Sequence, residues 1–239
     1  MDYKATFIGR EKLAAEVTVF HIEKPEGFRF LAGQYCLVSV PDIGFQDNRG
    51  LRRPFSISSS PLEEELLFVT RLSGSAVKRT MAEMPPGTAI TLGQPYGFLT
   101  LPENTAIPLA FLAGGVGIAP FRSLCRYATD AVTGHQITLF YSGRTLEETP
   151  FLEELQHMPE QNSRLRVVAT MTRVAEDPKK WSGPTGRLSA AMIKGYCATW
   201  GSAEYYIAGP PVMADAMKQT LEEMHIPQER IKIELFAGG

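Results

Sequence analysis

The first hundred residues alternate short apolar or β-branched runs with turn-forming residues. Clusters of glycine and proline, such as Pro25-Glu26-Gly27, separate these runs, so each run is predicted as a short strand. A series of short strands at this spacing favours a small antiparallel barrel or sandwich. The expected strands cover residues 3–8, 16–22, 35–40, 53–58, 66–72 and 89–92. One helix is expected at residues 75–84, which lack Gly and Pro and end at Pro85-Pro86-Gly87.

After about residue 100, strand-like apolar runs alternate with stretches that have helical periodicity. This alternation predicts βαβ units and a parallel sheet. We therefore expect two domains, an antiparallel β-barrel over residues 1–102 and an α/β domain over residues 103–239. The expected strands of the second domain cover residues 107–113, 136–141, 165–171, 205–208 and 231–235, and its helices cover residues 120–128, 149–156, 188–196 and 211–224.

Charge and cysteine content narrow the classes of partner and compartment. The 239 residues carry a net charge of -2, so no single-sign field favours nucleic acid. No apolar stretch is long enough to predict a membrane span. The three cysteines are dispersed and form no C-x-x-C pair, and the four histidines are scattered, so no metal site is expected. The absence of a disulfide pattern favours a reducing compartment, which predicts a cytoplasmic protein.

A glycine loop follows the first predicted strand of the second domain. It reads Gly114-Gly115-Val116-Gly117-Ile118-Ala119-Pro120 and opens a predicted helix. Glycines allow a phosphate to approach the backbone, and a helix N-terminus offers N–H donors. Pro120 stands where the usual dinucleotide fingerprint has its third glycine, so the loop departs from that motif. The alternative is a tight turn with no ligand.

Two segments of the first domain carry candidate chemistry. In Arg53-Pro54-Phe55-Ser56, an arginine suits a phosphate, an aromatic ring suits a flat ligand and a hydroxyl donates or accepts a hydrogen bond. The second segment, around Gly74-Ser75, begins the predicted helix, where it would serve as an N-cap and as an anion site. An edge strand that runs into a Ser-rich turn explains the Arg53–Ser56 segment equally well. Helix capping alone explains the Gly74-Ser75 segment.

Taken in order along the chain, these motifs and Ala208-Gly209-Pro210-Pro211 resemble the ferredoxin–NADP⁺ reductase family. The resemblance covers nearly the whole chain, and the ordered set is more specific than any one motif. It implies a flavin-binding barrel, a nucleotide-binding α/β domain and an NAD(P)H-dependent flavoprotein reductase activity. Because the cysteines offer no ligand set for an iron–sulfur cluster, it implies a stand-alone member with an external ferredoxin, flavodoxin or oxygenase component as electron acceptor.

The resemblance also implies roles for residues in the first domain and in the tail. Arg53 would bind a flavin phosphate, Phe55 would lie on the isoalloxazine ring and Ser56 would lie near the reactive nitrogen of the flavin. Glu234 is expected to act with Ser56 in catalysis, although it could simply end the last strand. FAD is the expected flavin, with FMN as the alternative. The expected flavin-binding residues are Arg53, Pro54, Phe55, Ser56, Arg71, Gly74, Ser75, Ala76, Val77 and Phe236.

The choice of nicotinamide cofactor depends on Thr172-Arg173, which follows the third predicted strand of the second domain. Family members that use NADPH often place a Ser or Thr plus an Arg here to hold the 2′-phosphate, whereas NADH users more often have an acidic residue. The pair favours NADPH, with NADH as the alternative and a solvated surface charge as the other interpretation of Arg173. The expected NAD(P)-binding residues are Gly114, Gly115, Gly117, Pro120, Arg144, Thr172, Arg173, Gly209 and Pro210.

Two other functions stay open on the sequence. A flavin reductase would use the same fold but treat free flavin as a substrate. A non-catalytic electron-transfer or regulatory subunit would keep the fold within a larger complex. The acidic run Glu63-Glu64-Glu65 is expected to be a solvated turn between two strands.

Overall fold

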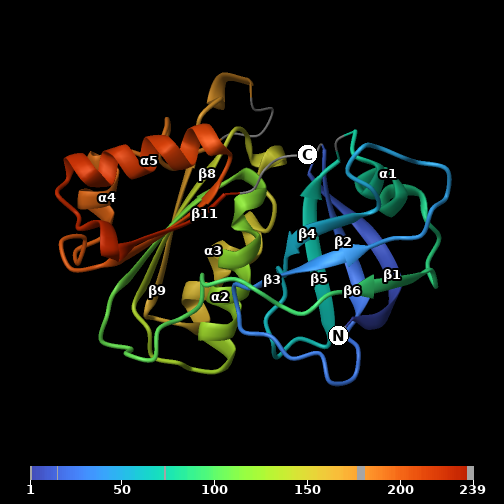
Figure 1. Cartoon of the computed structure of the whole chain (residues 1–239). Coiled ribbons are helices and arrows are strands. Elements are labelled where there is room, and N and C mark those ends of the chain that lie inside the picture. The colour runs from blue at the N-terminus through green and yellow to red at the C-terminus, as the bar shows by residue number, and fades with distance from the viewer. Residues whose placement is uncertain (1, 15, 73, 177–180, 236–239) are drawn as a thin grey trace.

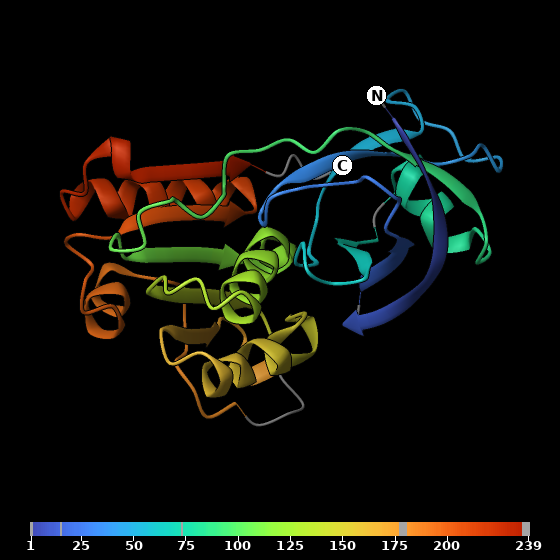
Figure 2. The same ribbon diagram turned by 90° about the horizontal axis from the view of Figure 1, so that it is seen from below.

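The computed structural model of the chain describes residues 2–14, 16–72, 74–176 and 181–235. An antiparallel β domain and an α/β domain lie side by side, with helices α2 (Ile118–Asp130) and α3 (Leu152–Gln161) facing the β domain (Figures 1 and 2). The predicted fold class is therefore confirmed. Within the described residues, no helix is long and apolar enough to span a membrane.

The β domain is built from strands β1 (Tyr3–Ala14), β2 (Val17–Glu23), β3 (Tyr35–Ser39), β4 (Arg52–Ser56), β5 (Glu65–Arg71) and β6 (Ala89–Leu92). Its sheet has the order β4-β3-β6-β1-β2-β5, and all neighbouring strands are antiparallel. The two edge strands approach each other just after β4, where Ser58 N donates to Leu67 O at 2.7 Å. Helix α1 (Ala76–Glu83) packs Val77 and Met81 into the core of this barrel.

Strand β1 is longer than the predicted residues 3–8 because it serves two neighbours. Its first residues, Tyr3 to Thr6, pair with β6, and the residues from Phe7 onward pair with β2. The register shifts between Phe7 and Gly9, where the strand changes partner. A bulge of this kind bends a strand and keeps it in two parts of a closed sheet. Gly9 interrupts the sequence pattern, so the local signal predicts an end where the fold has a bend.

The α/β domain contains five parallel strands, β7 (Leu109–Gly114), β8 (Ile137–Gly143), β9 (Leu165–Met171), β10 (Glu204–Gly209) and β11 (Ile231–Leu235). Their order in the sheet is β11-β10-β7-β8-β9. Helices α2 and α3 cover one face, and α4 (Ala190–Tyr196) and α5 (Pro211–Glu223) cover the other (Figure 1). Phe111 and Leu112, adjacent on β7, accordingly pack into different cores on the two faces.

Helix α3 begins later than the predicted start at residue 149 and runs past Pro159. Phe151, which precedes it, has a φ of 60°, an unusual backbone conformation for a residue with a side chain. The described residues also include four short 3₁₀ turns, η1 (Gly115–Gly117), η2 (Leu146–Glu148), η3 (Val174–Glu176) and η4 (Gln228–Arg230). The turn η2 ends at Glu148, directly before the predicted start of the helix, and α3 itself begins three residues after that start.

A buried arginine joins the two domains. The guanidinium of Arg122, on α2, donates to both carboxylate oxygens of Glu154 and both of Glu63, and to the carbonyl of Ser58. All five of its N–H groups therefore have acceptors. Glu63 and Glu64 lie in a turn between β4 and β5, as predicted, but the Glu63 carboxylate is bound to Arg122 rather than solvated, so that part of the prediction is wrong. The predicted boundary between residues 102 and 103 stays a prediction; it falls in the segment that connects β6 to β7.

Candidate functional site

The end of β4 and the end of β11 meet at the junction of the two domains. Ser56 Oγ lies 3.4 Å from Glu234 Oε1 and donates to it, although the residues are 178 positions apart. Ser56 is buried and Glu234 is partly buried. The structure thus brings together the two residues that the sequence predicted as catalytic.

The carboxyl group of Glu234 is in an unusual electrostatic position. Burial raises its pKa from 4.5 to about 7, and the hydrogen bond from Ser56 offsets part of that effect. Its second oxygen, Oε2, is buried and has no hydrogen-bond partner among the described residues. Near neutral pH, Glu234 therefore exists in both the protonated and the ionised form, which suits a group that holds or moves a proton.

The glycine loop lies close to this pair. In the parallel ladder, Glu234 is the register partner of Ala208 on β10. The loop packs against the same point, because a methyl group on Gly117 would lie 2.6 Å from Gly209 Cα and still closer to the Ala208 carbonyl. The predicted nucleotide loop, the end of β10 and the Ser56–Glu234 pair are therefore contiguous.

The glycines of this loop are required for different physical reasons. Gly114 and Gly117 face the turn between β10 and α5, where a side chain would strike Met213, Ala208 or Gly209. Gly115 has a φ of +54° and open space where a side chain would be. It is therefore Gly115 that borders room for a ligand at the N-terminus of α2, while Gly117 allows close packing within the protein. Pro120 is buried in the first turn of α2, and Pro210 is the N-cap residue of α5.

In the barrel, Arg53 and the first turn of α1 form the predicted phosphate site. Arg53 is buried, and its Nη1 donates to the carbonyls of Arg49, Gly50 and Arg52. Its Nη2 donates to both oxygens of Asp47, at 2.7 and 3.0 Å. Asp47 also accepts the backbone N–H of Ala76 at 2.8 Å. An internal carboxylate therefore holds the donors that the sequence assigned to a flavin phosphate.

These donors still fit a phosphorylated cofactor. Arg53 Nε is buried and has no partner among the described residues, so an additional anionic oxygen would satisfy it. Burial lowers the pKa of Lys78, and the positive charges of Arg49 and Arg53 lower it further. The positive charges of Arg49, Arg53 and Lys78 are thus close enough to act on one another near the start of α1, a concentration of positive charge that suits a diphosphate.

The other predicted flavin residues of the barrel lie around this cluster. Ser75 is the N-cap of α1 and accepts the backbone N–H of Lys78 at 3.4 Å, so its capping role is confirmed. Ala76 and Val77 bury their side chains, which leaves only their backbone for a ligand. Phe55 is 7% exposed and packs against Phe68 in the barrel core. Pro54 and Gly74 are exposed. Phe236 lies outside the described residues.

Side chains predicted for the two cofactors also meet across the junction. Arg71, at the end of β5, lies 3.3 Å from Glu148 Oε2, and Arg144 lies 3.6 Å from the same oxygen. Arg173 N donates to the Arg144 carbonyl at 2.8 Å, which brings the loops after β8 and β9 together. Thr172 donates its hydroxyl to the Gly143 carbonyl. Arg71 therefore bridges the two domains, because it also pairs with Glu16 of the barrel at 2.6 Å.

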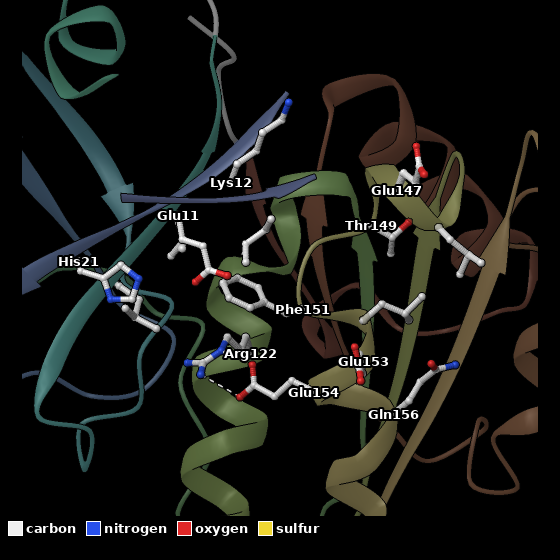
Figure 3. A pocket seen from close by; sticks show the side chains of 15 residues that line it. Glu11, Lys12, His21, Arg122, Glu147, Thr149, Phe151, Glu153, Glu154 and Gln156 are labelled. Atoms are coloured by element: carbon white, nitrogen blue, oxygen red, sulfur yellow. Dashed lines mark hydrogen bonds and ion pairs between the residues drawn. The ribbon is translucent and has the colours of Figure 1, made fainter. Parts of the chain in front are cut away.

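A pocket of about 860 Å³ lies elsewhere between the domains, and none of the predicted cofactor residues lines it (Figure 3). Its walls include Glu11 and His21 from the barrel, and Phe151 and Glu154 from the α/β domain, with Arg122 between them (Figure 3). Over the part of the chain that the structure describes, no group of three or more His, Cys, Asp or Glu side chains is arranged to hold a metal ion.

Sequence reasoning missed three charged residues that organise the site and the junction, Asp47, Arg122 and Glu148. The stretch Asp47-Asn48-Arg49-Gly50 has the composition of a turn, and Asp47 does form a local bond to Arg49 N at 2.8 Å. That local signal contains no information about Arg53 or Ala76. Arg122 and Glu148 likewise lie in a predicted helix start and a predicted loop, where a charged residue is ordinary.

Comparison with known proteins agrees with this arrangement. Residues 111–219 match the family of oxidoreductase NAD-binding domains. The chain is 26% identical over 221 residues to the reductase component of propane 2-monooxygenase from Rhodococcus jostii (strain RHA1), with 90% of this chain and 58% of that protein covered. The chain therefore spans little more than half the length of that relative.

Two further likenesses extend over nearly the whole length of both proteins. Ferredoxin–NADP reductase B from Sorangium cellulosum (strain So ce56) is 24% identical over 244 residues, covering 98% of this chain and 97% of that protein. A crystal structure of a ferredoxin NADP⁺ reductase from Neisseria gonorrhoeae with bound FAD and NADP matches with a TM-score of 0.77 and 25% identity, covering 98% of each chain. The chain is therefore similar over nearly its whole length to members of the ferredoxin–NADP⁺ reductase family.

Proposed function

We propose that the chain is an NAD(P)H-dependent flavoprotein reductase that passes electrons to a protein acceptor, such as a ferredoxin, a flavodoxin or an oxygenase component. A bound flavin supplies a centre that takes up a hydride and releases electrons singly. Among the relatives are a ferredoxin–NADP reductase and the reductase component of a monooxygenase, which supports both classes of acceptor.

The Ser56–Glu234 contact is the observation that carries this proposal. It joins the barrel strand assigned to flavin with the last strand of the nucleotide-binding sheet. Two flat rings, one bound in each domain, react only when the domains hold them in contact, so residues from both must converge at one point. The glycine loop packs beside that point through Ala208.

The barrel residues Arg53, Ser75 and the backbone at Ala76 would hold the flavin phosphate, and Arg49 and Lys78 add positive charge. FAD is the proposed flavin, with FMN as the alternative. Phe55 and Pro54 are proposed to lie beside the ring system. Because Phe55 is mostly buried, it would present an edge or a small part of its face unless the flavin displaces a neighbour.

The α/β domain would bind the pyridine nucleotide at the carboxyl ends of its strands, the usual ligand position in such sheets. The backbone of Gly115 and the N-terminus of α2 would receive the pyrophosphate. Gly209 and Pro210 would shape the nicotinamide pocket. Arg144, Thr172 and Arg173 would contact the adenosine end, and the Thr172-Arg173 pair supports NADPH as the preferred donor.

Ser56 and Glu234 are the proposed catalytic residues. Protonated Glu234 can donate a hydrogen bond through its carboxyl group, and Ser56 holds that group in place. Since burial raises the Glu234 pKa to about 7, the protonated form is well populated in neutral solution. We propose a cytoplasmic location, supported by three buried cysteines that are free of disulfides.

A second function, the reduction of free flavin as a substrate, is favoured by one observation. Asp47 holds Arg53 and Ala76, so it opposes tight retention of a flavin phosphate. The two functions differ in whether flavin stays with the protein through gel filtration.

The first experiment is an anaerobic absorption spectrum of the purified protein before and after NADPH and then NADH. A flavin spectrum that bleaches with NADPH supports the reductase and its donor. Bleaching that requires added flavin, which is lost again on gel filtration, supports the flavin reductase. A protein that shows no flavin spectrum and no nucleotide oxidation after addition of FAD or FMN would overturn both.

A further inference from the structure

The loop between β3 and β4 is held against helix α1 by two contacts. Phe45 lies under the guanidinium of Arg79, with 4.7 Å from Arg79 Cζ to the ring centroid. Two residues further along, Asp47 contacts the first turn of the same helix. The base of the loop is closed by the hydrogen bond from Val40 N to Leu51 O at 3.1 Å. Residues 41–50 thus form a strap across the start of α1.

The carboxylate of Asp47 accepts four hydrogen bonds. Oδ1 accepts Arg53 Nη2 at 2.7 Å and the backbone N–H of Arg49 at 2.8 Å. Oδ2 accepts the same Nη2 at 3.0 Å and the backbone N–H of Ala76 at 2.8 Å. The amides of Ala76 and Arg49 hold the Asp47 pKa at about 2, so the group is ionised at every physiological pH.

The donors that hold Asp47 are of the kind that hold phosphate groups. A guanidinium and the first amides of a helix bind either anion, because both present charged oxygens to the same N–H groups. A phosphate cannot reach the Ala76 amide and Arg53 Nη2 while the Asp47 carboxylate occupies them. A phosphate and the Asp47 carboxylate, brought to the same donors, would also repel each other.

We propose that Asp47 is a resident competitor for the flavin phosphate, which must displace it from Arg53 and Ala76 to bind. The inference rests on the proposed flavin site in the barrel. Displacement requires movement only of the strap, since Asp47 lies between Gly44 and Gly50, which have φ values of 101° and 69°. Arg53 keeps its three carbonyl contacts through Nη1 and stays in place as the carboxylate leaves.

Competition of this kind sets the affinity for flavin and the selectivity between flavins with and without a phosphate. Flavin affinity is lowered by the free energy needed to break the hydrogen bonds that hold Asp47 to Arg53 and Ala76. The reduction applies to FAD and FMN, which carry phosphate, and not to riboflavin, which has none. Asp47 therefore determines how readily the protein exchanges its flavin. The opposite role, in which Asp47 only orients Arg53 toward the phosphate, predicts the opposite sign.

The test is to titrate flavin into the flavin-free full chain carrying Asp47→Asn. Binding is measured by the change in flavin fluorescence. The matched control is Asp42→Asn, which removes the same charge from the same strap, where Asp42 accepts hydrogen bonds from Gly44 and Gln46 and, among the described residues, none from Arg53 or Ala76. We expect the Kd of Asp47→Asn for FAD and FMN to fall by about tenfold, the effect of removing one competing charged group. The Kd of Asp47→Asn for riboflavin should equal that of the wild type. The Kd values of Asp42→Asn for FAD and FMN should also equal those of the wild type.

Equal or weaker FAD binding by Asp47→Asn overturns the inference, and weaker binding assigns Asp47 the orienting role. If Asp47→Asn does not fold, Phe45→Ala replaces it, because it loosens the strap without touching Arg53 and should also lower the Kd for FAD. If the wild type binds no flavin at all, the proposed function fails by itself. The competition is then measured with inorganic pyrophosphate, which should raise the melting temperature of Asp47→Asn more than that of the wild type, and an equal rise overturns it.

Discussion

The two helix N-termini assigned to phosphate groups are built in contrasting ways. At α1, in the barrel, charged side chains define the site, with Arg53 buried and Asp47 bound to it. At α2, in the α/β domain, glycines define the site, and backbone atoms of β10 fill the space beside Gly117. The first site is held by charge and the second by shape.

The contrast has a physical consequence for how each site responds to change. A charged site can be occupied by an internal anion, so its affinity depends on the competition between carboxylate and phosphate. A site made of backbone and glycine offers no such group, and its binding depends on whether the loop can adopt its conformation. A diphosphate is thus expected to exchange with an internal carboxylate at α1. At α2, its binding is expected to depend on the packing of the glycine loop.

The largest effect is expected from Gly117→Ala, which tests the site held by shape. The new methyl group would lie 2.6 Å from Gly209 Cα and closer to the Ala208 carbonyl, so the loop or β10 must move. We expect roughly 2–3 kcal/mol of lost stability, typical of overpacking, measured by urea unfolding, together with loss of NADPH binding. Gly195→Ala, which meets nothing within 4 Å on helix α4, is the control and should keep both. Wild-type NADPH affinity in Gly117→Ala would contradict the packing argument.

The next effect is expected from Arg53→Ala, which tests the site held by charge. Flavin phosphate loses a charge-assisted contact, so flavin affinity should fall by about 1.5–3 kcal/mol, measured as the Kd for FAD. The variant also removes the guanidinium from the Asp47 carboxylate, which keeps only the amides of Arg49 and Ala76, and this loss destabilises the fold. The double variant Arg53→Ala with Asp47→Asn should recover that stability but not the flavin affinity. Flavin content equal to the parent protein would remove Arg53 from the site.

An intermediate effect is expected from Glu234→Gln, at the point where the two sites meet. Because protonated Glu234 is the form proposed to act, the rate of flavin bleaching by NADPH should fall as pH rises through about 7. The folded protein holds this proton more tightly than the unfolded chain, whose ordinary value is 4.5, so stability from this group is also lost as pH rises toward 7. Glu234→Gln should flatten both profiles.

Stopped-flow absorption and urea unfolding between pH 5.5 and 8.5 (about the range in which the group titrates) measure these two profiles. The control is Glu229→Gln, an exposed carboxyl group in η4. A pH profile of Glu234→Gln that matches the wild type would assign the titration to another group.

The smallest effect is expected from Arg173→Ala, at the outer end of the nucleotide site. Loss of one partly solvated contact to the 2′-phosphate should raise the KM for NADPH by roughly fivefold, the scale of about 1 kcal/mol. The KM for NADH, which lacks that phosphate, is the internal control and should not change. An equal rise for both nucleotides would remove Arg173 from the phosphate-binding role and leave the contrast between the two helix N-termini unaffected.

Much of the molecule could be predicted from local sequence. Strands β6, β9 and β11 agree with the expected ranges at both ends, and α1 is preceded by the expected cap, Ser75. Glycine, proline and apolar periodicity act within a few residues, so they determine where elements begin and end. Strand β1 and helix α3 were predicted less well, because a change of strand partner and the positive φ of Phe151 depend on distant packing.

The candidate site divides in the same way. The motifs carried by Arg53, Ser56 and the glycine loop were identified from the order of residue types along the chain. The acid that engages Arg53 was not, and neither was the role of Glu63 as a partner of Arg122. A carboxylate on a turn has the same local signature whether it is solvated or buried against an arginine, so the sequence pattern cannot distinguish the two.

The sequence by itself thus determined the kinds of element, their order and the motifs that carry chemistry, because these properties depend on neighbouring residues. The tertiary structure alone decided which charged and polar groups meet. Asp47 reaches Ala76 across 29 positions, Glu63 reaches Arg122 across 59, and Ser56 reaches Glu234 across 178. Each contact exists only after barrel closure and docking of the two domains have placed its partners within hydrogen-bond distance, and electrostatic interactions of this kind are strong only at such distances.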